Sequence, residues 1–359
     1  MDLLTARIDL DAIAHNTRVL KQRAGDARLM CVVKADAYNH GAQRVVPVMD
    51  ASGADAFGVA TLAEGASISE LTAKPVAAWL WVPGQEIPPG VELGVPTLDH
   101  LSWLIDARVN APLHIKVDTG MHRSGLRESD WEAAFRMAAR AGLEVKGLMS
   151  HLAVADDPAN PYTDAQADAF RRAVALARQV GLEVPVNHLA NSPALLSRPD
   201  LAFDQVRAGV GLYGLEPIAG GGSDLRPAMS WVARVLAVKP LSVGEAVSYG
   251  LTWAAPDNGF VAVVTAGYAD GVARSWQGCL DVAIGAHRYP QVGRVCMDQF
   301  IVWLGDNDAG VAIGDEAVIF GAGGVGATEL ADRVGTINYE IVCAPTGRTV
   351  RTYTGGTGA

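Results

Sequence analysis

The chain has 359 residues, of which 50% are hydrophobic and 19% are charged. This length exceeds the roughly 250–300 residues at which single hydrophobic cores stop growing, so we expect two domains. The composition is too apolar for a disordered chain. The formal net charge of −10 argues against a nucleic-acid-binding protein, because phosphate neutralisation needs clustered Lys and Arg.

Membrane and secretory signals are missing from the sequence pattern. No run approaches the roughly 18 apolar residues of a membrane span, and the first residues lack the basic and apolar regions of a secretory signal. The four cysteines are too far apart for a zinc pair or a dense disulfide framework. We therefore expect a cytoplasmic protein with free thiols, no membrane partner and no metal.

Short apolar runs alternate with helical patterns over the first part of the chain. The runs that predict strands are Leu29–Val33, Ala56–Ala60, Val76–Val82, Leu113–Val117, Val145–Met149, Val186–Leu189 and Gln205–Ala208. Capping boxes at Ser129–Glu132 and Thr163–Gln166 predict the starts of two helices. Repeated β-then-α units favour a (β/α)₈ TIM-type barrel, although a doubly wound sheet gives the same local pattern.

The pattern changes at the glycine-rich stretch 216–223, after which β-branched runs separated by turns replace the helices. These runs are Val232–Val238, Phe260–Thr265, Val311–Ile313 and Ala317–Phe320. We expect a barrel over residues 11–227 and a mostly β domain over 228–359. Residues 1–10 would form an N-terminal segment, with a strand on the C-terminal domain as one option.

One motif points to a different function. Residues 321–326 match G-x-G-x-x-G, the fingerprint of a dinucleotide site. Too little chain follows for the remaining strands of such a fold, so we predict a turn here.

Lys34 lies at the carboxyl end of an apolar strand, in the sequence V-V-K-A-D-A-Y. Active sites of barrels are built at that end of the strands. A lysine desolvated there has a lowered pKa, which suits covalent chemistry with a carbonyl group. A surface lysine just past a strand is the alternative, but the chain offers few other lysines that could compete.

A second strand carries three ionisable side chains on one face: His114, Lys116 and Asp118. Such groups on a buried strand are costly unless they are paired. They predict a polar cluster in the barrel mouth, with Arg123 on the following loop. A simple ion pair between Lys116 and Asp118 is the alternative.

Other predicted strands also end in polar or glycine residues: His151, Asn191, Ser192, Arg207 and Gly209–Gly211. The Asn-Ser pair and the free amides of the glycine turn are the groups expected in a phosphate site. In the β domain, Tyr249, Tyr268, Met297 and Tyr339 lie in or beside turns. Each feature alone also fits a structural role, such as a core histidine or an ordinary turn tyrosine.

Together these motifs resemble the alanine racemase family, in the family's order and over nearly the whole chain. The resemblance implies a barrel of fold-type III that binds pyridoxal 5′-phosphate, followed by a β domain. It also implies a homodimer with active sites shared across the interface. The expected activity is interconversion of L-alanine and D-alanine, which supplies D-alanine for peptidoglycan.

The resemblance also assigns roles to residues of this sequence. Lys34 is the lysine that binds the cofactor covalently, and Tyr249 is the second catalytic base. The residues implied around the cofactor phosphate are Tyr38, Asn191, Ser192, Gly209, Val210 and Tyr339. His151 would support the cofactor ring, Arg207 would face its nitrogen, and Arg123 would contact its phenolic oxygen and the substrate. Tyr268 and Met297 would line the substrate side from the partner subunit, and Lys116 would be carbamylated.

Racemisation removes a proton from one face of Cα and returns one on the other, so it needs two acid/base groups. Lys34 would serve the D-alanine face and Tyr249 the L-alanine face, with a cationic His151 stabilising the phenolate. The alternatives are a broad-specificity amino-acid racemase or a decarboxylase on the same fold, and a non-catalytic carrier of the cofactor. A metal- or sugar-phosphate barrel lacks its ligand spacings here.

Overall fold

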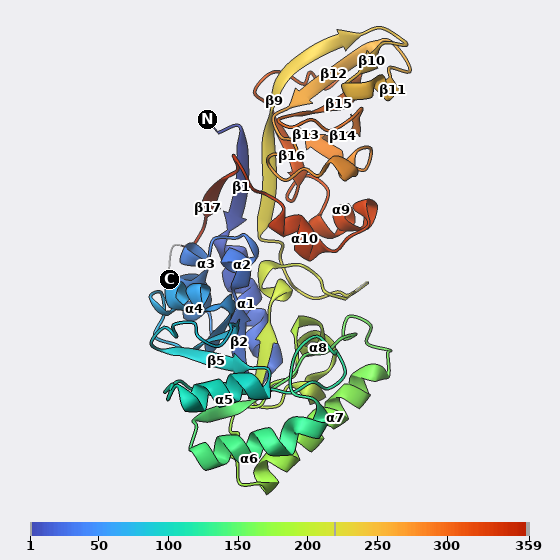
Figure 1. The fold of residues 1–359 in the computed structure, drawn as a ribbon. Coiled ribbons are helices and arrows are strands. Elements are labelled where there is room, and N and C mark those ends of the chain that lie inside the picture. The colour runs from blue at the N-terminus through green and yellow to red at the C-terminus, as the bar shows by residue number, and fades with distance from the viewer. Residues whose placement is uncertain (1, 219, 357–359) are drawn as a thin grey trace. The chain divides into compact units, whose positions relative to one another are not determined.

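The structure is a computed structural model that describes residues 2–218 and 220–356. The chain forms two compact units. The barrel unit consists of residues 12–37 and 41–226, and the β unit consists of residues 2–11, 38–40 and 227–356. Each unit has its own sheet, as Figure 1 shows. Among the described residues, no helix combines the length and the apolar character that a membrane crossing requires.

The sheet of the barrel unit is parallel, with strand order β7-β6-β5-β4-β3-β2-β8. Its strands are β2 (Arg28–Val32), β3 (Ala56–Thr61), β4 (Val76–Leu80), β5 (Val91–Val95), β6 (Leu113–Lys116), β7 (Val145–Met149) and β8 (Gln205–Ala208). Most of them are buried on both faces, as parallel strands covered by helices are. Six of the seven match predicted strands, and β5 was not predicted.

Residues 186–190 complete the barrel between β7 and β8. Val186 and His188 donate backbone hydrogen bonds to β7, and Arg207 of β8 donates to the carbonyl of Ala190. The segment forms a single bridge to Met149 rather than the regular strand predicted for Val186–Leu189. A Cβ at Gly147 would lie 1.8 Å from the Val186 carbonyl oxygen, so only glycine allows this close approach.

Helices connect the strands of the barrel unit. They are α1 (Leu10–Ala24), α2 (Lys34–Tyr38), α3 (Ala42–Ala51), α4 (Leu62–Ser69), α5 (Leu98–Asp106), α6 (Trp131–Ala141), α7 (Tyr162–Gln179) and α8 (Ser192–Ser197). Both predicted capping boxes were wrong. The hydroxyl of Ser129 donates to Asp130. Helix α7 begins before Thr163, whose hydroxyl is buried and has no hydrogen-bond partner among the described residues. A true capping box opens α4, where Thr61 and Glu64 cap each other.

The β unit is built on one long strand, β9 (Met229–Leu241). The other strands are β1 (Leu4–Asp9), β10 (Ala246–Val247), β11 (Trp253–Ala254), β12 (Gly259–Val264), β13 (Asp281–Ile284), β14 (His287–Val292), β15 (Phe300–Gly305), β16 (Glu316–Phe320) and β17 (Val350–Thr354). β9 pairs with β16 and β12, and the order β12-β15-β14-β13-β16-β9 closes on itself. The first residues of β9 also pair with β1, which pairs in turn with β17.

Two short helices complete the β unit, α9 (Ala327–Val334) and α10 (Asn338–Cys343). The G-x-G-x-x-G sequence before α9 is a turn, as predicted, in which Gly321 accepts from Gly324 and donates to the carbonyl of Val325. The strand predicted at Val311–Ile313 is irregular. The fold class is otherwise as predicted: a TIM-type barrel followed by an antiparallel β domain.

Candidate active site

Lys34 follows β2 at the carboxyl end of the barrel strands, where it was predicted. The next five residues, from Ala35 to Asn39, all have φ between 52° and 66°. This is a left-handed turn, which costs non-glycine residues roughly 1–2 kcal/mol each. Side chains hold it in place: Glu64 accepts from the Ala35 amide, and Asp36 accepts from the Ala42 amide, both at 2.7 Å. The turn therefore fixes the point at which Lys34 leaves the strand.

Lys116, at the end of β6, is close enough to Lys34 for their charges to interact. Burial and the positive charges around it, that of Arg123 first, lower the pKa of Lys116 to about 8. Its ammonium donates to the hydroxyl of Ser124. Asp118 accepts instead from His122 at 3.0 Å, so the simple Lys116–Asp118 ion pair is not what this strand forms.

His151 follows β7 and is half-buried. Burial and neighbouring cations, Arg207 first, lower its pKa well below the usual range. Its Nδ1 faces Nη2 of Arg207 at 3.4 Å, and because a guanidinium can only donate, Nδ1 is the acceptor. The expectation of a cationic His151 was therefore wrong: the ring is neutral and carries its proton on Nε2.

Arg207 of β8 is 5% exposed, and within the described part of the chain its side chain bonds only to uncharged groups. Nη1 donates to Nδ1 and to the carbonyl of His188, at 2.9 and 2.8 Å. Nη2 donates to the carbonyls of Leu189 and Ser150. Burial lowers the pKa of Arg207 to about 10, so the side chain remains a cation at neutral pH.

Ser192 links the start of α8 to the turn that follows β8. Its hydroxyl accepts from the amides of Gly209 and Gly211, at 2.8 and 3.4 Å. These two amides are therefore engaged, not free as predicted. Asn191 caps α8 by accepting from Ala194, and a 3₁₀ turn begins at Val210. The starts of both helical segments are thus held side by side, and their first N–H groups have no acceptor within the segment.

The three loops predicted to line the substrate side lie together in the β unit. Ser248, beside Tyr249, donates to the carbonyl of Arg294 at 2.7 Å. The amide of Tyr268 donates to the carbonyl of Cys296 at 3.0 Å, next to Met297. The side chains of Tyr249, Met297 and Tyr268 are 72%, 52% and 42% exposed. They share one end of this unit and are not packed into its core.

Tyr38 and Tyr339 also meet within the β unit, with ring centroids 6.1 Å apart. Tyr38 is buried, and this burial raises the pKa of its phenol, which therefore stays protonated. Tyr339 lies on α10 and is half-buried. The phenol of Tyr38 therefore keeps its proton and can donate a hydrogen bond.

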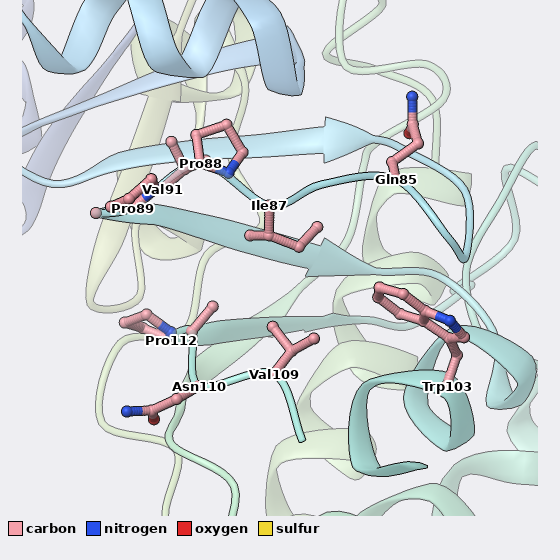
Figure 2. A pocket seen from close by; sticks show the side chains of 11 residues that line it. Gln85, Ile87, Pro88, Pro89, Val91, Trp103, Val109, Asn110 and Pro112 are labelled. Atoms are coloured by element: carbon pink, nitrogen blue, oxygen red, sulfur yellow. The ribbon is translucent and has the colours of Figure 1, made fainter. Parts of the chain in front are cut away.

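A separate pocket of about 420 Å³ lies at the opposite, amino-terminal ends of β5 and β6. Figure 2 shows Ile87, Val109 and Trp103 along it. Its lining is mostly apolar side chains and prolines, without the bases that gather around Lys34. The candidate active site therefore lies at the carboxyl ends of the strands, where the basic side chains gather.

Comparison with known proteins finds the same family over both units. Residues 8–217 match the family model "Alanine racemase, N-terminal domain", and residues 228–353 match "Alanine racemase, C-terminal domain". The chain belongs to the alanine racemase family. This confirms the family, the fold and the enzyme class that the sequence motifs predicted. Members of the family use pyridoxal 5′-phosphate to interconvert L-alanine and D-alanine.

Relatives cover nearly the full length of the chain. The alanine racemase of Corynebacterium efficiens is 58% identical over 99% of both chains, and that of Mycobacterium tuberculosis is 45% identical over 98% of this chain and 96% of its own. The crystal structure of the Corynebacterium glutamicum enzyme superposes with a TM-score of 0.91 at 52% identity, covering 99% of this chain and 100% of that chain. The Streptomyces lavendulae enzyme gives 0.92 at 36% identity, covering 99% and 98%.

Sequence reasoning missed part of the barrel interior. It placed His114 in the barrel mouth with Lys116, whereas His114 is 2% exposed and bonds to Glu92 of β5 and to His188. A signal was available, because Glu92 is the only charged residue in the otherwise apolar sequence V-E-L-G-V.

Proposed function

We propose that this chain is a pyridoxal 5′-phosphate-dependent alanine racemase that works as a homodimer by a two-base mechanism. The observation that carries this proposal is the gathering of Lys34, Lys116, Arg123, Arg207 and His151 at one end of the barrel. Four of these side chains bear cationic groups, so the site suits a ligand with several negative charges. We also propose that the enzyme works in the cytoplasm and supplies D-alanine for peptidoglycan.

The donor groups present fit this cofactor. Its phosphate would be held by the amide groups that begin α8 and the 3₁₀ turn at Val210, together with Ser192. Tyr38 and Tyr339 would donate hydrogen bonds to the phosphate as well. Arg207 would face the ring nitrogen, and Lys34 Nζ would hold the aldehyde carbon. The site offers cations and neutral hydrogen-bond donors, so it suits an anionic group such as a phosphate.

Pyridoxal 5′-phosphate, when bound, makes the α-hydrogen of an amino acid acidic by delocalising the electrons of the Cα–H bond. The chain supplies the two bases. Lys34 Nζ would take or return the proton on the D-alanine face, and Tyr249 Oη on the L-alanine face. The exposure of Tyr249 supports a role toward a second molecule.

Arg207 and His151 would determine the protonation of the cofactor ring nitrogen and of the Tyr249 phenol. Arg207 keeps its proton at neutral pH and would donate a hydrogen bond to the ring nitrogen without protonating it. His151, with its proton on Nε2, would donate to the phenolate oxygen of Tyr249. A neutral donor of this kind stabilises the phenolate by a hydrogen bond instead of a full charge.

The pKa of Lys116 supports the proposed carbamylation. A neutral amine attacks CO₂, so that an N–C bond forms and one proton is released. A pKa of about 8 leaves an appreciable neutral fraction at pH 7.5. The carbamate is an anion, so it would place a negative charge between the positive groups that surround Lys116. It would accept a hydrogen bond from Arg123.

The exposed apolar side chains of the β unit support the dimer. Tyr249 and Leu251 are 72% and 66% exposed, and Met297 and Tyr268 belong to the same group of loops. Several large exposed apolar side chains on neighbouring loops are typical of an interaction site. We propose that a second copy of the chain covers it and receives Tyr249 into its active site.

Kinetics of Tyr249→Phe test the mechanism. With added cofactor, the wild type should racemise alanine faster than serine or lysine. The variant should lose proton abstraction from L-alanine more than from D-alanine, while still binding the cofactor. Tyr289→Phe, on β14 of the same unit, is the control and should remain active. Unchanged exchange of the α-proton of L-alanine in Tyr249→Phe would refute the assignment.

Mixing two inactive variants tests the sharing of sites. A dimer of Lys34→Ala with Tyr249→Phe has one site that contains both wild-type residues only if the residues come from different chains. Activity should therefore return after the two variants are mixed and allowed to exchange subunits. No recovery, with mixed dimers present, would show that each site is built from one chain.

A further inference from the structure

A chain of four side chains runs through the interior of the barrel, from β8 to β5. Nη1 of Arg207 bonds to Nδ1 of His188 at 2.9 Å. Nε2 of His188 bonds to Nδ1 of His114 at 2.9 Å, and Nε2 of His114 bonds to Oε2 of Glu92 at 2.8 Å. All four residues are at most 8% exposed. We call this set the barrel chain.

The two ends of the barrel chain fix its direction. A guanidinium can only donate, and a carboxylate can only accept. His188 must therefore accept at Nδ1 and donate from Nε2, and His114 must do the same. Any other tautomer, or a second proton on either ring, would break at least one of the three hydrogen bonds.

The charges around the chain agree with a neutral His188. Burial and the charge of Arg207, with smaller contributions from His114 and Arg28, lower the pKa of His188 well below its usual range. Burial alone would raise the pKa of Glu92, but the hydrogen bond from His114 and the charges of Lys146 and Arg28 lower it. Glu92 is therefore ionised and can only accept.

The far end of the chain lies away from the cofactor residues. Glu92 and His114 line a pocket of about 180 Å³ with Arg28, Lys146 and Gln205, near the amino-terminal ends of the strands. The near end is Arg207, whose direct hydrogen bonds all go to uncharged groups. Among the described residues, the hydrogen bonds of Arg207 thus lead to one carboxylate, that of Glu92, through the rings of His188 and His114.

We propose that Glu92 and His114 are positioning residues for racemisation, which hold Arg207 in one orientation by fixing the tautomer of His188. This rests on the proposed function, in which Arg207 faces the cofactor. A guanidinium held at Nη1 by a ring of fixed tautomer cannot rotate without losing that bond. The orientation of a group at the active site would then be set by a carboxylate at the other end of the barrel.

Nitrogen-15 NMR of the full-length, cofactor-loaded protein, labelled at histidine, tests this inference directly. The signals of His114 and His188 are assigned by their loss in His114→Asn and His188→Asn. In the wild type both rings should show the Nε2–H tautomer and no titration between pH 5 and 8. In Glu92→Ala, His114 loses its acceptor, and only the hydrogen bond from Arg207 still favours the original direction. Because Arg207 can then turn away as the rings change tautomer, both rings should show mixed tautomers.

Kinetics separate positioning from a structural role. Glu92→Ala should lower kcat about tenfold with little change in KM for alanine, because the orientation of Arg207 is no longer enforced. Glu92→Gln keeps an oxygen acceptor of the same shape and should restore both the tautomers and most of kcat. Glu144→Gln, a surface carboxylate paired with Lys146, is the matched control and should behave as wild type.

Two results would overturn the inference. One is a wild-type His188 that titrates near pH 6.5 or carries its proton on Nδ1. The other is a folded Glu92→Ala with unchanged tautomers and unchanged kcat. An inactive wild-type protein with the expected tautomers would instead contradict the proposed function, so the two failures are distinguishable.

Discussion

The backbone amide of Gly209 donates to the hydroxyl oxygen of Ser192 at 2.8 Å, and this bond joins the turn after β8 to the first residue of α8. Ser192 is 3% exposed, so the bond is shielded from water. The serine therefore organises the anion site as well as contributing to it.

Ser192→Ala should weaken cofactor binding and destabilise the fold by about 1–3 kcal/mol, because buried amides lose their acceptor. Ser197→Ala removes a hydroxyl from the same helix, where it donates to the carbonyl of Pro193, and should leave cofactor affinity unchanged. Cofactor titration and thermal unfolding measure both effects. Equal affinities in the two variants would contradict the role given to Ser192.

Carbamylation of Lys116 should depend on pH. With a pKa of about 8, the neutral fraction of the amine rises from about a tenth at pH 7 to about nine tenths at pH 9. The carbamate signal seen by ¹³C NMR with labelled bicarbonate should therefore appear faster as pH rises over this range. Lys116→Arg should abolish the signal, and its persistence in that variant would place the carbamate on another lysine.

Asp270 should control the loop that carries Tyr268. Its buried carboxylate accepts from Nε and Nη2 of Arg348, at 2.8 and 2.7 Å, and from the amide of Gly267 at 3.1 Å. Asp270→Asn should raise KM for alanine and lower the melting temperature. Asp298→Asn removes a single exposed contact to Arg348 and is the control. If both variants shift KM equally, the loop is not positioned by Asp270.

The left-handed turn after Lys34 predicts an unusual response to glycine. Ala35 is exposed with φ of 53°, so Ala35→Gly should be neutral or stabilise the fold by up to about 1 kcal/mol. Ala133→Gly, at an exposed position of the right-handed helix α6, should destabilise by about 1 kcal/mol. Thermal unfolding of the two variants gives the comparison. A similar loss in both would mean that Ala35 carries no strain.

Local patterns were enough to predict much of the candidate site. An apolar strand followed by Lys34, and polar residues after several other strands, already indicated a barrel mouth with bases and anion donors. The capping boxes failed because Ser129 and Thr163 have the right spacing but the wrong place: one bonds to its neighbour and the other lies inside α7. Spacing alone does not determine where a helix begins.

The sequence by itself determined the fold class, the family and the residues at the carboxyl ends of the strands, because apolar periodicity and short motifs are local properties. Only the tertiary structure decided the partners of Arg207, the neutral state of His151 and the path from His188 to Glu92. These depend on which strands are neighbours and in what register, so that residues 18 to 74 positions apart exchange hydrogen bonds. Burial then sets their protonation, and burial is a property of the assembled barrel.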